Sequence, residues 1–281
     1  MRDGSAPPPS HVAGPSRYRV APGAGIRLAE LDPDETEGYG GKGDVRDELA
    51  AHRDRIAELQ ARLFAEQRRS LLIVLQALDT GGKDGAIKGV FRGVNPQGCH
   101  VWSFRVPSAE EASHDFLWRY HHKAPARGMI AIFNRSHYED VLAVRVKGLV
   151  GEEVWRPRYE AIRDFERGLA REGVVLLKFF LHITRDEQKR RLERRIQDPA
   201  KHWKFNPNDL RERAAWDDYQ RAYEDAINAT STDEAPWLVV PANHKWFRNL
   251  VLARTIADTL EALDPRYPDP VPDIERFVVP A

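Results

Sequence analysis

The chain has very little cysteine, no excess of charge of either sign and no long apolar run. Cys99 is the only cysteine in 281 residues, so no disulfide can form within the chain, and a reducing compartment such as the cytoplasm fits it. Lys and Arg (43) balance Asp and Glu (43), which argues against a general nucleic-acid-binding protein. No segment approaches membrane-spanning length and the N-terminus lacks an apolar signal region, so we expect no membrane partner. The composition indicates a soluble globular protein with a sizeable core.

Five apolar segments alternate with segments of helical periodicity. This alternation predicts an α/β fold in which a five-stranded parallel sheet is flanked by helices on both faces. The predicted strands lie at residues 71–75, 98–104, 129–133, 174–183 and 237–240. The main predicted helices lie at residues 44–69, 86–92, 110–123, 159–172 and 246–262.

The composition also predicts how the chain is divided. Residues 1–43, rich in Pro and Gly, are expected to form a disordered or extended N-terminal arm, and residues 264–281 a Pro-rich tail. Residues 44–263 form the predicted domain. Within it, the stretch from about 185 to 229 is helical but very polar, so we interpret it as a mobile lid over the active site.

Residues 71–85 predict a phosphate-binding loop, because a buried strand, a Gly-rich turn carrying Lys83 and a helix follow one another. Glycines let backbone N–H groups approach phosphate oxygens, the helix N-terminus adds a favourable dipole, and the lysine supplies a point charge. The loop departs from G-x-x-x-x-G-K-[ST] at Ala77 and at Asp84, which replaces the hydroxyl that binds Mg²⁺. Asp79 is a substitute ligand. An ordinary strand–helix turn with a solvated lysine is the alternative. The predicted phosphate-binding residues are Thr80, Gly81, Gly82, Lys83, Asp84, Gly85, Lys88 and Arg92.

Two further groups follow strand ends, where ligands bind in parallel sheets. Arg135 follows the strand at 129–133 and can bind a phosphate bidentately, with Glu139 close by as a carboxylate. Arg191 and Arg195 lie four apart on one helix face after the strand at 174–183. A polar strand exit and a solvated charged face are the alternatives. Lys88 and Arg92 would extend the positive track beyond Lys83, which hints at a polyanion longer than a nucleotide.

Several motifs, in order, resemble the polyphosphate kinase 2 family over about residues 44–263. They are A-L-D-T-G-G-K-D-G (77–85), G-V-N-P-Q-G (93–98), F-N-R-S-H-Y-E-D (133–140), D-P-A-K-H-W-K-F (198–205) and P-A-N-H-K-W (241–246). The resemblance implies a three-layer P-loop kinase-like fold with a helical lid. It implies reversible transfer of the terminal phosphoryl group of inorganic polyphosphate to nucleotides, with Mg²⁺ as cofactor and Mn²⁺ as an alternative.

By the same resemblance, Asp79, Lys83 and Arg135 are catalytic, Arg191 and Arg195 belong to the basic lid, and Asp79 is a metal ligand. Much of the family carries Asp where this chain has Asn134, and other members carry Asn where it has Glu139, so Glu139 is the candidate second metal ligand. Asn134 and Glu139 are also assigned to the nucleotide side of the site. This form of the motif looks like the class III subgroup, which accepts both AMP and ADP.

The implied partners are inorganic polyphosphate, AMP, ADP and ATP, with guanine nucleotides as further candidates, and a homo-oligomer (dimer or tetramer) is expected. Two rival functions remain from the residues alone. An ATP-dependent nucleotide kinase would need no site for a long polyanion. A non-catalytic polyphosphate or nucleotide sensor would bind without turnover.

Overall fold

A six-stranded sheet forms the centre of the molecule. The computed structural model describes residues 16–280, and the strands run in the spatial order β1-β6-β5-β2-β4-β3. All neighbouring pairs are parallel except β1 with β6, which is antiparallel. The strands are β1 Arg19–Val20, β2 Ser70–Gln76, β3 Cys99–Ser103, β4 Ile130–Asn134, β5 Val174–His182 and β6 Trp237–Pro241.

The five predicted strands are confirmed, but the predicted strand count was wrong. The sixth strand, β1, has two residues and comes from the segment expected to be an arm; Val20 is buried beside Trp237. Two residues are too few to give a periodic pattern, so the sequence carried no signal for this strand. Every residue of β2 and β5 is buried, as expected for central strands covered on both faces.

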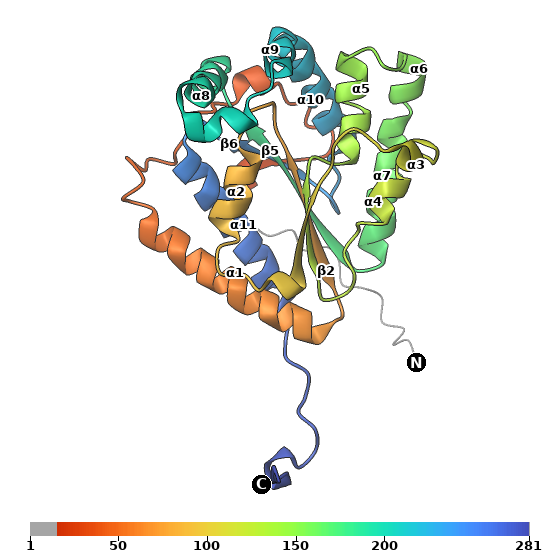
Figure 1. The fold of residues 1–281 in the computed structure, drawn as a ribbon. Helices are drawn as coiled ribbons and strands as arrows, with labels where there is room; N and C mark the ends of the chain where they lie inside the picture. The colour runs from red at the N-terminus through yellow and green to blue at the C-terminus, as the bar shows by residue number, and fades with distance from the viewer. Residues whose placement is uncertain (1–15, 281) are drawn as a thin grey trace.

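Helices cover both faces of the sheet (Figure 1). On one side lie α1, α2 and α11, and on the other lie α4 and α7, while α8, α9 and α10 lie over one end of the sheet. The helices are α1 Arg46–Glu66, α2 Lys83–Val90, α3 Ala109–Ala112, α4 Trp118–His121, α5 Ala143–Val146, α6 Glu152–Trp155, α7 Arg158–Arg171, α8 Arg185–Gln197, α9 Asn208–Ala214, α10 Trp216–Thr230 and α11 Lys245–Leu263.

The predicted helix at 110–123 is in fact two short helices, α3 and α4. Ser108 begins α3 with a capping box to Glu111, in agreement with the expected start. The helix ends at Ala112, and the hydroxyl of Ser113 donates to the Glu110 carbonyl oxygen (2.8 Å). Between α3 and α4 the Asp115 carboxylate accepts a hydrogen bond from the backbone N–H of Leu117 (2.9 Å), a local bond that competes with helix continuation.

The polar stretch after β5 contains parts with different packing. The last part, α10, buries a full apolar face against the body of the protein, so the expectation that this whole stretch is too polar for the core was wrong there. The buried side chains of α10 are Trp216, Tyr219, Ala222, Tyr223, Ala226, Ile227 and Thr230. By contrast, α9 and the preceding 3₁₀ turn η5 (Pro199–Lys204) bury no residue.

The division of the chain into arm, domain, lid and tail stays a prediction, and residues 1–15 lie outside the described part. The chain from the end of η1 (Ser16–Tyr18) onward packs on the domain, since Tyr18 and Leu28 are buried. The apolar side of helix α1 packs in the core of the protein, where Leu49, Ile56 and Leu63 are buried. No helix in residues 16–280 combines the length and the apolarity needed to cross a bilayer.

Candidate active site

The phosphate loop connects β2 to α2 in a backbone conformation that L-residues rarely adopt. Thr80 (φ 63°) and Gly82 (φ 99°) are both left-handed. A side chain at Gly81 would collide with Ala77 Cβ and lie 2.8 Å from the Leu78 carbonyl oxygen, so this position requires glycine. The loop therefore presents bare backbone at the N-terminus of α2, the arrangement that binds phosphate.

Lys83, the first residue of α2, points back over the loop. Its Nζ donates to the Ala77 carbonyl oxygen at 2.9 Å. Burial, and then the nearby charge of Arg135, lower the pKa of Lys83 to about 8. Ala77, which replaces the usual first glycine, thus contributes through its backbone, and an incoming phosphate would offer Lys83 a stronger partner than a carbonyl.

The end of β4 carries Arg135 into the same place. Arg135 is left-handed (φ 63°), and its backbone N–H donates to the Leu75 carbonyl at the end of β2 (3.2 Å). Its guanidinium donates to Asp79 Oδ1 (2.8 Å) and lies 3.7 Å from Glu139 Oε2. The Glu139 carboxylate raises the pKa of Arg135, so this residue stays charged. The structure thus brings Asp79, Lys83, Arg135 and Glu139 together.

Asn134 and Asp84 face each other across the loop. Asn134 Nδ2 donates to Asp84 Oδ1 (2.8 Å), and Lys204 of η5 lies 3.7 Å from Asp84 Oδ2. Asp84 therefore links the phosphate loop to β4 and to the segment above it. Lys204 was not among the predicted site residues, although it lies in the motif at 198–205.

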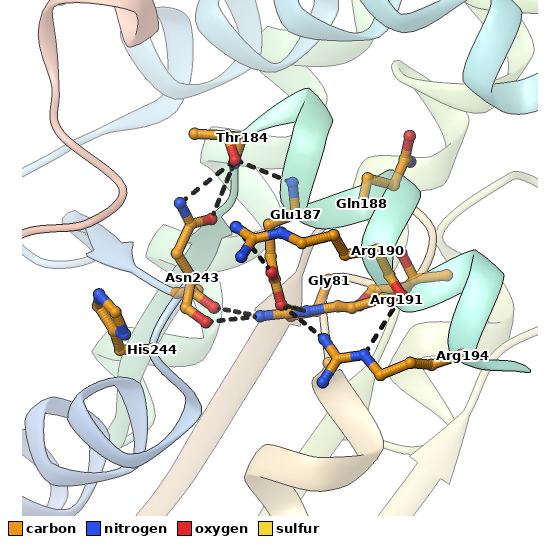
Figure 2. Close-up of polar contacts among 12 residues, drawn as sticks. Gly81, Thr184, Glu187, Gln188, Arg190, Arg191, Arg194, Asn243 and His244 are labelled. Carbon is orange, nitrogen blue, oxygen red and sulfur yellow. Dashed lines mark hydrogen bonds and ion pairs between the residues drawn. The ribbon is translucent and has the colours of Figure 1, made fainter. Parts of the chain in front are cut away.

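Arg191 is directed inward, beneath the phosphate loop (Figure 2). Only 6% of it is exposed, its Nε donates to Glu187 Oε1 (2.6 Å), and Nη1 donates to the carbonyls of Thr80 (3.1 Å) and Gly81 (2.9 Å). Nη2 donates to Ala242 (2.5 Å) and Asn243 (3.1 Å) in the turn before α11. We expected a lid arginine that binds phosphate, but Arg191 instead holds the loop's carbonyls.

Arg248 of α11 is a buried cation that sequence reasoning missed. It is 1% exposed, and Nη1 donates to the Gly82 carbonyl (3.1 Å). Burial, and then the charge of Arg191, lower the pKa of Arg248 to about 9. Within the described chain Arg248 forms no ion pair with a carboxylate, so its charge adds to the positive potential at the loop. A single Arg in a helical pattern gives no sequence signal for this role.

A buried polar network supports the turn that follows Arg135. In this turn, η4 (His137–Asp140), Tyr138 donates to Glu166 Oε1 (2.8 Å) and accepts from Lys178 Nζ (2.9 Å). Lys178 also donates to Glu166 Oε2 (2.6 Å), and His137 Nε2 lies 3.1 Å from Glu166 Oε1. Burial alone would raise the pKa of Glu166, but Lys178 and His137 outweigh it and hold the pKa below its usual range. The turn is thereby fixed to β5 and α7.

The other predicted cations lie farther out. Arg195 pairs with Asp209 of α9 (3.1 Å), which connects α8 to the segment above the site. Lys88, in α2, and Arg92, just after it, are exposed and line a hollow beside this helix. The structure does not gather them with Asp79, Lys83 and Arg135.

The donor set suits a metal ion that is shared with substrate phosphates. Within residues 16–280, no three His, Cys, Asp or Glu side chains come together as a ready-made metal cage. Mg²⁺ commonly binds through one or two carboxylates plus substrate phosphates, and Asp79 and Glu139 supply two carboxylates around Arg135. These residues fit such an ion.

A mostly parallel sheet with a glycine-lined phosphate loop, a loop lysine and an arginine at the end of the neighbouring strand defines a P-loop phosphotransferase. Residues 41–268 match the family model described as polyphosphate kinase 2. The chain belongs to the polyphosphate kinase 2 family.

Known relatives support this assignment over nearly the whole chain. The sequence is 51% identical over 264 residues to the AMP/ADP-polyphosphate phosphotransferase of Meiothermus ruber, covering 94% of this chain and 99% of that protein. It is 41% identical to the ADP-polyphosphate phosphotransferase of Rhodopseudomonas palustris, covering 91% and 93%. The crystal structure of polyphosphate kinase 2 from Arthrobacter aurescens TC1 superimposes with a TM-score of 0.89 at 45% identity, covering 94% and 95%.

Proposed function

We propose that this protein transfers the terminal phosphoryl group of inorganic polyphosphate to AMP and to ADP, reversibly, as a class III member of its family. The observation that carries the proposal is the meeting of Lys83, Asp79 and Arg135 at the phosphate loop. The relatives named for AMP/ADP- and ADP-polyphosphate phosphotransfer support the substrate class.

In this proposal the residues act by position and charge, as phosphoryl transfer requires. An oxygen of the acceptor phosphate attacks the terminal phosphorus in line, and the shortened polyphosphate leaves. Lys83 and Arg135 hold the equatorial oxygens, while the loop's N–H groups bind the neighbouring phosphates. Asp79, hydrogen-bonded to Arg135, orients that guanidinium. Arg191 and Arg248 act through the loop backbone.

We further propose Mg²⁺ as the cofactor, with Mn²⁺ as an alternative, held by Asp79 and Glu139 together with substrate phosphates. When bound, the ion neutralises phosphoryl charge. We propose that the lid is the stretch from η5 through α9, because these elements bury no residue and touch the loop through Lys204. The proposed setting is the cytoplasm, as the single Cys99 favours. A homo-oligomer and use of guanine nucleotides also remain proposals.

The test is product formation by purified protein with Mg²⁺ and long-chain polyphosphate, with AMP or ADP supplied separately. Formation of ADP and then ATP from AMP supports the whole proposal. Activity with ADP alone overturns the class III assignment. Reaction of AMP with ATP but not with polyphosphate indicates an ATP-dependent nucleotide kinase, and binding without turnover indicates a sensor.

A further inference from the structure

A hollow lined by three cations lies beside α2, past the phosphate loop. It is lined by Arg53 of α1 and by Gly85, Lys88, Gly89, Phe91 and Arg92. Among the described residues, Arg53, Lys88 and Arg92 form no ion pair with a carboxylate. This contrasts with Arg55 on the same helix, which pairs with both Glu58 (2.9 Å) and Glu261 (2.8 Å).

Arg53 is the least expected of the three cations. Its side chain is half-buried, and its Nε is buried without a hydrogen-bond partner. Burial, and then the charge of Arg92, lower the pKa of Arg53. Like charges gathered without a carboxylate repel one another, so an anion bound between them would be stabilised.

The hollow extends along α2 as far back as Gly85, in the first turn of the helix that follows the phosphate loop. Gly82, Gly85 and Gly89 follow at spacings of three and four residues, so they share one helix face. The side chains of Arg248 and Asn249 from α11 lie against Gly82 and Gly89, so the open part of this face is at Gly85. Arg248 borders this face, with Nη2 3.6 Å from the position of a Cβ on Gly85. Lys88 lies about 7.5 Å along the helix axis from Lys83, at about 1.5 Å per residue.

We propose that Arg53, Lys88 and Arg92 form a distal phosphate site, which holds the polyphosphate chain beyond the phosphates bound at the loop. This inference rests on the proposed function and assigns the direction of the chain, from the loop past Gly85 toward α1. Three cations and no carboxylate in the lining suit repeated phosphates better than a nucleobase, which needs acceptors as well as donors.

Chain-length dependence tests the site. We would measure Kd by calorimetry, and KM with ADP, for long-chain polyphosphate and for tripolyphosphate, which is too short to span both places. Arg53→Gln removes the cation that α1 contributes to the hollow, and Arg92→Gln removes the cation that follows α2. Arg46→Gln, at the exposed start of α1, is the matched control.

We expect wild-type protein to bind the long chain more tightly than tripolyphosphate. Each of the two variants should raise Kd and KM for the long chain by about fivefold, the value of one partly exposed charge pair. The ratio of the tripolyphosphate Kd to the long-chain Kd should therefore fall in both variants. Arg46→Gln should leave this ratio unchanged.

Equal losses for both substrates, or no loss for the long chain, would overturn the distal site. So would a calorimetric titration in which orthophosphate alone binds and Arg53→Gln weakens it, because the hollow would then serve free phosphate. If wild-type protein binds the long chain with this length dependence but phosphorylates neither AMP nor ADP, the proposed function fails and the site stands.

Discussion

Removing Lys178 should destabilise the protein strongly and disturb the site at the same time. Lys178 is fully buried in β5, where its Nζ donates to Glu166 (2.6 Å), Tyr138 (2.9 Å) and the Thr230 carbonyl (2.8 Å). Lys178→Met leaves the Glu166 carboxylate buried without its cation. Breaking a buried pair in this way costs about 3–5 kcal/mol, which lowers Tm by roughly 10 °C in a protein of this size.

The double variant Lys178→Met/Glu166→Gln separates the pair from the rest of the network. It leaves no buried charge, and the side-chain amide oxygen introduced by Glu166→Gln can still accept from Tyr138. Its loss should therefore fall short of the summed single losses by about 2 kcal/mol. Lys189→Met, on the exposed side of α8, is the control and should cost less than about 0.5 kcal/mol. The assay is urea unfolding, followed by kcat at 25 °C. A loss below about 1 kcal/mol for Lys178→Met would refute the reasoning.

Three further outcomes follow from the site. Lys83→Ala and Asp79→Ala should each abolish transfer with Tm within about 2 °C of wild type; a variant that keeps most activity removes that residue from the mechanism. Because the pKa of Lys83 is lowered to about 8, raising the pH through 8 removes the charge of its ammonium group. The value of kcat/KM should therefore fall in this pH range. A pH profile that stays flat to about pH 9.5 would contradict this prediction. Arg191→Lys loses the guanidinium fork, so it should lower kcat and also lower the free energy of unfolding, measured with urea, by about 2 kcal/mol. Arg190→Lys, on the exposed side of α8, is the control and should match wild type. Equal effects of the two substitutions would show that the fork is dispensable.

The phosphate loop and the five long strands were predictable because their signals are local. An apolar run, glycines and one lysine within residues 71–85 specify a strand, a turn and a helix without knowledge of the rest of the chain. The strands β2, β4, β5 and β6 carry such apolar runs, and β3 carries the apolar pair Val101 and Trp102. By contrast, β1, with two residues, is defined only by its partner β6.

The supports of the site depend on tertiary contacts and were therefore missed. Arg191 belongs to a helix with so many charged residues that the sequence does not reveal which side of the helix is buried. In the structure, Gln188 and Leu192 are buried beside Arg191. Arg248 meets the loop from a helix more than 160 positions away along the chain. Lys178 did leave a signal, since a lysine within a wholly apolar strand requires a buried partner, but the sequence does not say that the partner is Glu166.

The guanidinium of Arg191 also has a consequence for how the molecule opens. By binding the carbonyls of Thr80, Gly81, Ala242 and Asn243 at once, it joins the phosphate loop, the first half of α8 and the turn before α11 into one cooperative unit. Amide hydrogens of these three segments should therefore exchange with solvent together and slowly. The amide hydrogens of η5 and α9 should exchange faster. In Arg191→Lys, the amide hydrogens of the phosphate loop should exchange about as fast as those of η5 and α9. In the proposed function the anion-binding loop is therefore the stationary side of the site, and the proposed lid begins after Gln197.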